Sequence, residues 1–147
     1  MQKILVAVDG SDASDRAVAV AVEVATALAA RLLVIHVVHD STLVPVPMGV
    51  MAQVEGAYIT AREVMESAAA ELTGTAAGLA ERSGVTAVEQ LIRFGPPART
   101  IVDTADAEEV DLIVMGRRGL SDFSGLILGS VTHKVGHLAA QPVMTVP

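Results

Sequence analysis

Short apolar runs separated by polar segments recur along the chain, and they predict a series of strands. The first is β-branched and ends at the turn-forming sequence DGSD, and the second is continuously apolar. Runs of this length and composition, bounded by turn residues, are typical of strands buried on both faces. The five runs are KILVAV at 3–8, RLLVIHVV at 31–38, TAVEQLIRF at 86–94, DLIVM at 111–115 and PVMTV at 142–146.

The segments between these runs carry helix signals. Helices are expected over about 14–30, 57–83, 97–107 and 129–139. Ser11, Asp12 and Ser14 offer N-cap side chains for the first, Ser83-Gly84 is a glycine stop for the second, and Pro97 suits the first turn of the third. Residues 39–56, which hold Pro45, Pro47 and Gly49, are expected to form a loop.

Strands that alternate with helices predict an α/β fold with an open, mainly parallel sheet and helices on both faces. No internal repeat or linker divides the chain, so residues 1–147 are expected to form a single domain. In such sheets a ligand crevice lies beyond the strand carboxyl ends, where the winding direction reverses. The candidate positions for ligand contacts are therefore Asp9, the segment after Val38, Gly95 and the residues from Gly116 onward.

Composition and net charge exclude several classes of function. The net charge of −7 argues against a broad nucleic-acid surface, and the absence of cysteine excludes disulfides and thiol–metal sites. The most apolar stretch, 17–30, contains Glu23 and falls short of the roughly 20 apolar residues of a membrane-spanning helix. The first residues lack the apolar region of a secretory signal. We expect a soluble, cytoplasmic protein with neither nucleic-acid nor membrane partners.

The segment GRRGLSDFSGLILGS, 116–130, has glycines spaced Gly116-x2-Gly119-x9-Gly129, followed by Ser130. Glycines let a backbone approach a ligand closely, and the N-terminus of the next helix suits a phosphate, with Ser130 as an additional donor. The segment is also compatible with an ordinary glycine-rich loop in which Ser130 caps the helix. It matches neither a Walker A loop nor a dinucleotide fingerprint.

Several polar side chains have two readings each. Asp9 ends the first strand, where it can accept hydrogen bonds from a ribose or act as a turn residue. Arg117 and Arg118 can pair with phosphate oxygens or remain solvated loop charges.

His36 lies in an apolar strand, which favours a hydrogen-bonded core histidine. His133 and His137 have a spacing that fits a metal, yet no nearby carboxylate supports this, and an ordinary helix surface is favoured.

The chain resembles the universal stress protein family over essentially its full length. Four segments carry the resemblance: KILVAVDGSDASDRAV, VIHVV, GPPARTIVDTADAEEVDLIVMGRRG and GLILGSVTHKVGHLAAQPVMTV. The glycine spacing is similar to the ATP-binding pattern of the family, G-x2-G-x9-G-[ST]. A second branch of the family lacks this pattern and does not bind ATP, so the resemblance is to the ATP-binding branch.

This resemblance implies a Rossmann-like five-stranded parallel sheet in the order 3-2-1-4-5. It also implies an ATP site at the reversal point, with Mg²⁺ held mainly by the phosphates and water. The adenine would contact backbone at Val8 and Val37, beside Ala7. Asp9, Met115 and Gly116 would line the nucleoside. The phosphates would be bound by Gly119, Gly129, Ser130 and Val131. Arg118 is included as a further contact, at a position that varies in the family. A homodimer through 142–146 is also implied.

Three functions remain open from the sequence. The first is a stress-response or signalling regulator that binds ATP, with at most slow hydrolysis because no general base is evident. The second is an interaction module in which nucleotide binding is incidental. The third is an adenylyl transferase, which the sequence DGSDAS after the first strand disfavours. The sequence identifies no protein partner, and it does not distinguish ATP from ADP or a cyclic nucleotide.

Overall fold

The computed structural model describes residues 1–39, 51–120 and 128–147. Strands and helices alternate along these ranges, as the apolar pattern predicted. The elements are β1 (Lys3–Ala7), α1 (Asp12–Leu28), β2 (Arg31–Val38), α2 (Met51–Arg82), β3 (Val88–Phe94), α3 (Pro97–Ala107), β4 (Leu112–Gly116), α4 (Ser130–Leu138) and β5 (Val143–Val146). The part of the predicted loop 39–56 that covers 40–50 lies outside the described residues.

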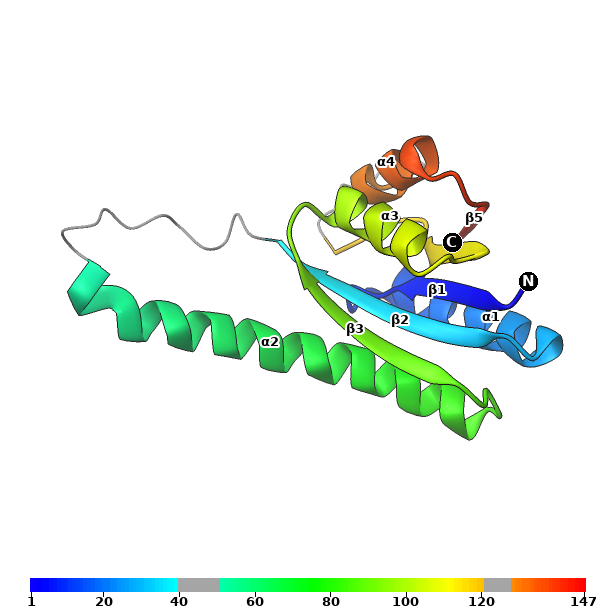
Figure 1. Ribbon diagram of the computed structural model, residues 1–147, viewed down its shortest axis with the longest axis horizontal. Coiled ribbons are helices and arrows are strands. Elements are labelled where there is room, and N and C mark those ends of the chain that lie inside the picture. Colours follow the sequence, from blue (N-terminus) through cyan, green and yellow to red (C-terminus); the bar gives the residue numbers. More distant parts are fainter. Residues whose placement is uncertain (40–50, 121–127) are drawn as a thin grey trace.

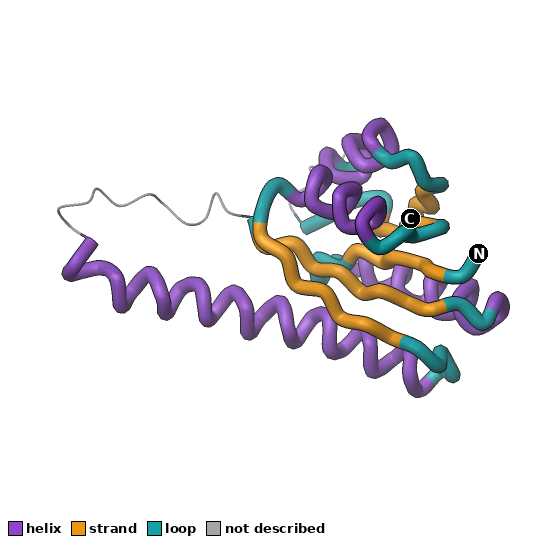
Figure 2. Tube along the Cα trace, in the orientation of Figure 1, coloured by secondary structure: helices purple, strands orange, loops and turns teal. Residues whose placement is uncertain are grey.

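The five strands form one parallel sheet in the order β3-β2-β1-β4-β5 (Figures 1 and 2). This confirms the predicted order, in which the winding direction reverses between β1 and β4. Ala7 is paired with Ile35 of β2 on one side and with Met115 of β4 on the other. The carboxyl end of β1 therefore lies at the centre of the edge where a ligand crevice was expected.

Helices cover both faces of the sheet, α1 and α2 on one and α3 and α4 on the other (Figure 1). The alternation of side chains along each strand builds two separate cores. Ile4 and Val6 of β1 pack with the small residues Ala17 and Ala21 of α1, whereas Leu5 packs on the opposite face with residues of α3. Because central strands are buried on both faces, they read as continuous apolar runs in the sequence.

One expectation about helix boundaries was wrong. α2 begins at Met51 rather than near residue 57, because the prolines and Gly49 precede it and a single glycine, Gly56, does not end a helix. Figure 1 shows its N-terminal half running on past the carboxyl end of β2. The start of α4 agrees with the predicted helix over about 129–139: Gly129 is the N-cap and Ser130 is the first helical residue, which excludes the alternative in which Ser130 caps the helix.

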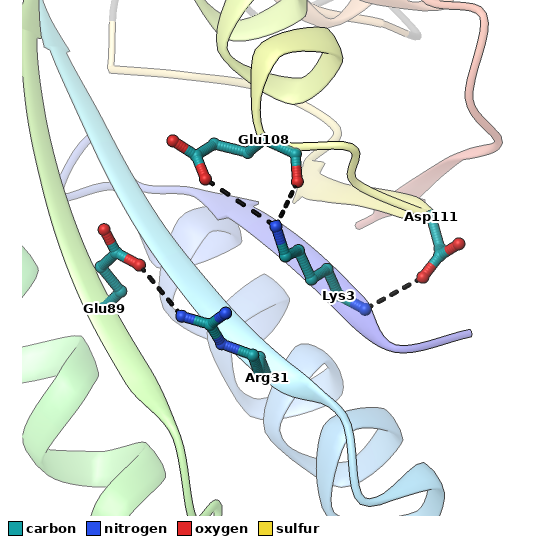
Figure 3. A network of polar contacts seen from close by, with 5 residues as sticks. All are labelled: Lys3, Arg31, Glu89, Glu108 and Asp111. Atoms are coloured by element: carbon teal, nitrogen blue, oxygen red, sulfur yellow. Dashed lines mark hydrogen bonds and ion pairs between the residues drawn. The ribbon is translucent and has the colours of Figure 1, made fainter.

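The amino ends of the strands, opposite the expected crevice, are joined by polar contacts (Figure 3). The Lys3 ammonium donates to the Glu108 carbonyl at 2.6 Å and lies 3.9 Å from the Glu108 carboxylate. The backbone N–H groups of Gln2 and Lys3 both donate to Asp111 Oδ2, at 2.5 and 3.0 Å. These contacts connect the start of β1 to the end of α3 and to the start of β4.

The described helices include none that combines the length and apolar character needed to cross a membrane.

Candidate functional site

A cavity of about 440 Å³ opens at the carboxyl edge of the sheet, around the ends of β1, β2 and β4. Its volume lies within the range of small-molecule sites in proteins, about 300–1,000 Å³. Ten of the eleven sequence-predicted site residues line it: Ala7, Val8, Asp9, Val37, Met115, Gly116, Arg118, Gly119, Ser130 and Val131. The eleventh, Gly129, is buried next to Ser130 as the N-cap of α4. The structure therefore brings the predicted set together in one place.

Asp9 belongs to a hydrogen-bonded turn that joins β1 to α1. Its Oδ1 accepts the Ser11 N–H at 2.9 Å, and its own N–H donates to Ser14 Oγ at 3.2 Å. Ser11 caps α1, because its hydroxyl oxygen accepts the Ser14 N–H at 3.1 Å. With Oδ1 held by the turn, the second carboxylate oxygen of Asp9 is the one available to a molecule in the cavity.

Gly116 ends β4 where this strand meets the start of α1. A Cβ atom at this position would lie 2.9 Å from the Ala13 carbonyl carbon and 2.9 Å from the Ser14 nitrogen. Those atoms are backbone and have little room to move, so only glycine lets β4 and α1 approach this closely. The carbonyl of Gly116 accepts the buried Thr132 hydroxyl at 2.9 Å, which ties the first turn of α4 to the same point.

The two ends of the glycine-rich segment meet across a short backbone bridge. The Gly129 N–H donates to the Arg117 carbonyl at 2.7 Å, and the Arg117 N–H donates to Val146 of β5 at 2.6 Å. Ser11 Oγ donates to the Arg118 carbonyl at 3.5 Å. The segment therefore starts and ends at the cavity mouth, whatever its path through 121–127, which lies outside the described residues.

The first turn of α4 faces the mouth of the cavity. Ser130 and Val131 line the cavity. The first hydrogen bond of the helix runs from the His133 N–H to the Gly129 carbonyl at 2.9 Å. The N–H groups of a first helical turn have no partner within the helix, and Gly129 has no side chain to cap them. They carry about half a unit of positive charge and suit an anion.

Arginine adds cationic character at the same place. Arg118 lines the cavity, and both Arg117 and Arg118 are partly buried. The Nε atoms of both guanidinium groups are buried without a hydrogen-bond partner among the described residues. A buried guanidinium N–H without a partner is costly, and an anionic ligand is one way to satisfy it.

Part of the cavity wall was not predicted from the sequence. Met65, Ala68, Ala69 and Leu72 of α2 line one side of it. Pro97 and Ile101 of α3 line another. These residues carry no motif, because their place at the cavity depends on how α2 and α3 pack on the sheet. Apolar residues at helical spacing are the expected pattern of any packed helix, so the sequence held no signal for them.

The histidines differ in environment. His36 is hydrogen-bonded, as expected, but it is only partly buried and lines the cavity. Its description as a core residue is therefore wrong. His133 and His137 lie exposed on α4 with ring centroids 4.6 Å apart. Within 1–39, 51–120 and 128–147, no three side chains of His, Asp or Glu gather into a metal-binding group.

Comparison with known proteins matches the whole chain to one family model, described as the universal stress protein family, over residues 1–147. The Bacillus subtilis universal stress protein YxiE is 34% identical over 145 residues, covering 98% of this chain and 97% of the relative. Universal stress protein UspA from Lactobacillus plantarum has a similar structure, with a TM-score of 0.81, 26% identity, and coverage of 99% and 97%. A universal stress protein solved in complex with cAMP gives a TM-score of 0.68 at 29% identity, with coverage of 99% and 95%.

Proposed function

Because this chain belongs to the universal stress protein family, we propose that it binds ATP in the cavity at the carboxyl edge of the sheet. We propose further that it acts as a stress-response or signalling regulator. The observation that carries this proposal is the meeting of ten predicted residues around one cavity of about 440 Å³. The relative solved with cAMP supports an adenine nucleotide as the ligand class.

The chemistry of the cavity suits the parts of such a nucleotide. Apolar side chains of β1, β2 and β4 form a surface on which a base can lie, and Asp9 Oδ2 is available to accept from a ribose hydroxyl. The phosphates would lie against the first turn of α4, with Gly119, Ser130 and the guanidinium of Arg118 around them. Mg²⁺ would arrive with the phosphates and be held mainly by them and by water.

This role uses the nucleotide as a signal, and we expect at most slow hydrolysis. The groups around the phosphates supply binding, and none of them is placed as a general base among the described residues. We propose a cytoplasmic location and a single nucleotide-binding domain over residues 1–147. If a protein partner bound this chain equally well with and without nucleotide, an interaction module with incidental nucleotide binding would replace the proposal.

We also propose that the protein forms a homodimer through β5. This strand is an edge of the sheet, and its exposed residues Met144 and Thr145 are uncharged. The opposite edge strand, β3, exposes Glu89 and Arg93 instead. Charged side chains hinder pairing between edge strands, so β5 is the edge suited to a second copy.

A pair of glycine substitutions on α4 tests the ATP proposal. Gly129→Ala places a methyl group at the N-cap beside the phosphate position, and the φ of −67° there accepts alanine. Gly136→Ala, on the same helix, adds a methyl group where nothing lies within 4 Å. We expect calorimetric titration with Mg-ATP to show a large loss of affinity for Gly129→Ala alone. Unchanged affinity in Gly129→Ala would count against the site.

A further inference from the structure

The hydrogen-bond ladder between β1 and β2 ends before β2 does. Paired residues run from Lys3 and Arg31 to Ala7 and Ile35, and the last bond runs from the Val8 N–H to the Ile35 carbonyl at 2.9 Å. In a regular parallel ladder, the Val37 N–H would next donate to the Val8 carbonyl. That bond is not formed between these two described residues.

His36 takes the place of this missing bond. Its ring Nδ1 lies 2.7 Å from the Val8 carbonyl oxygen. Because a carbonyl oxygen only accepts, Nδ1 must carry a proton and donate it to this bond. The Val8 carbonyl is thus satisfied by a side chain instead of by the neighbouring strand, at a residue that lines the cavity.

The backbone N–H and C=O of Val37 consequently face the cavity. Successive residues of a central strand direct their N–H and C=O groups alternately to the two neighbouring strands. Ile35 bonds toward β1, whereas the Val38 carbonyl accepts the Gly95 N–H on the β3 side at 3.0 Å. The N–H and C=O of Val37 therefore point toward β1, beyond the last bond of its ladder. Val37 is partly buried and lines the cavity.

We propose that His36 is a positioning residue that keeps the β1–β2 ladder from closing and so reserves the N–H and C=O of Val37 for the ligand. A donor and an acceptor side by side match an aminopurine edge, which offers a ring nitrogen that accepts and an amino group that donates. The identity of this ligand rests on the proposed function. The state of the Val37 backbone does not, and it can be measured without nucleotide.

Removing the His36 Nδ1 donor should change the hydrogen bonding between β1 and β2. In His36→Phe the Val8 carbonyl loses its partner, and an unsatisfied buried carbonyl is costly. In a regular parallel ladder the donor to this carbonyl is the Val37 N–H, so we expect the ladder to close and to compete with the ligand. His36→Asn is the matched control, because its side-chain amide nitrogen occupies nearly the place of Nδ1 and still donates.

Amide hydrogen exchange, followed by NMR on the protein without nucleotide, tests the arrangement first. In the unchanged protein and in His36→Asn, we expect the Val37 amide to exchange at least about tenfold faster than the bonded Val8 amide. In His36→Phe we expect Val37 to become protected. Equal protection of Val37 and Val8 in the unchanged protein would overturn the inference, even if His36→Phe failed to fold.

Titration with Mg-ATP tests the consequence for binding. We expect affinity to fall about tenfold in His36→Phe, which is the scale of one lost hydrogen bond, and to stay near the original in His36→Asn. Wild-type affinity in His36→Phe would overturn the inference and leave the proposed function standing. No binding of any adenine nucleotide to the unchanged protein would instead overturn the proposed function, with the exchange experiment still deciding the role of His36.

Discussion

The carboxylate of Asp9 has two oxygens with different tasks. Oδ1 accepts the Ser11 N–H at 2.9 Å and so holds the turn between β1 and α1. Oδ2 is the oxygen left for the ribose in the proposed complex. A residue at the end of a strand can therefore be both a turn residue and a ligand contact, and the two readings that the sequence allowed for Asp9 are compatible.

Asp9→Asn separates these two tasks. The amide oxygen can keep the bond to Ser11, while an amide nitrogen replaces the acceptor that faces the ligand. We expect the affinity for Mg-ATP to fall about tenfold with little change in Tm, because one hydrogen bond is lost. Asp12→Asn, which makes the same charge change on the exposed first turn of α1, is the control for calorimetry. Equal affinity in the two variants would contradict the ribose contact.

Asp111 illustrates a carboxylate with a structural task at the opposite edge of the sheet. The backbone N–H groups of Gln2 and Lys3 donate to it and lower its pKa below the ordinary 3.8. A carboxyl group whose pKa is lowered by folding stabilises the folded state above its ordinary pKa, and this contribution is lost as the pH falls through the folded-state pKa.

We therefore expect Asp111→Ala to lower Tm at pH 7 and the difference from the unchanged protein to shrink as the pH falls below about 3.8. Thermal unfolding between pH 7 and pH 2.5 measures it. Asp103→Ala, which removes only an exposed ion pair with Arg99, is the control and should change Tm less at pH 7. A Tm difference for Asp111→Ala that grows on acidification would refute this assignment.

Among the elements, the end of β4 and the start of α1 form a tight backbone-to-backbone junction near the site. Gly116→Ala would place its methyl group 2.9 Å from two backbone atoms of α1. Overpacking of this kind costs about 1–3 kcal/mol, so we expect chemical denaturation to show a loss of that size. Gly136→Ala in the open interior of α4 should instead stabilise the protein by about 0.5–1 kcal/mol. Similar effects of the two substitutions would contradict the tight junction.

The elements also show what the sequence could and could not predict. Buried central strands such as β2 were placed correctly, because a continuous apolar run leaves few alternatives. The start of α2 was misplaced, because loop-forming prolines and a tolerated helical glycine lie close together before residue 57. The predicted site residues follow strand ends, which topology brings together. Met65 and Leu72 gave no such signal, because only packing brings them to the cavity.

At the scale of the whole molecule, the proposed dimer depends on the open edge of β5. The bonds from Ile113 N to Pro142 O and from Arg117 N to Val146 O show which backbone groups of β5 face β4. By alternation, the N–H of Thr145 faces the open edge. Thr145→Pro removes this donor and leaves the pairing with β4 intact.

We expect sedimentation analysis to show Thr145→Pro dissociating to monomers at concentrations where Thr145→Ala, which keeps the N–H, remains dimeric. A dimer of unchanged strength in Thr145→Pro would place the interface elsewhere.

We propose above that one adenine nucleotide occupies the cavity around the carboxyl ends of β1, β2 and β4. The most direct test is an NMR titration of the protein, freed of nucleotide, with Mg-ATP. If the nucleotide binds there, we expect saturable shifts concentrated at the amides of Val8, Asp9, Val37, Gly116, Gly119, Ser130 and Val131. An absence of shifts at millimolar ATP, or shifts confined to residues away from this edge of the sheet, would contradict it.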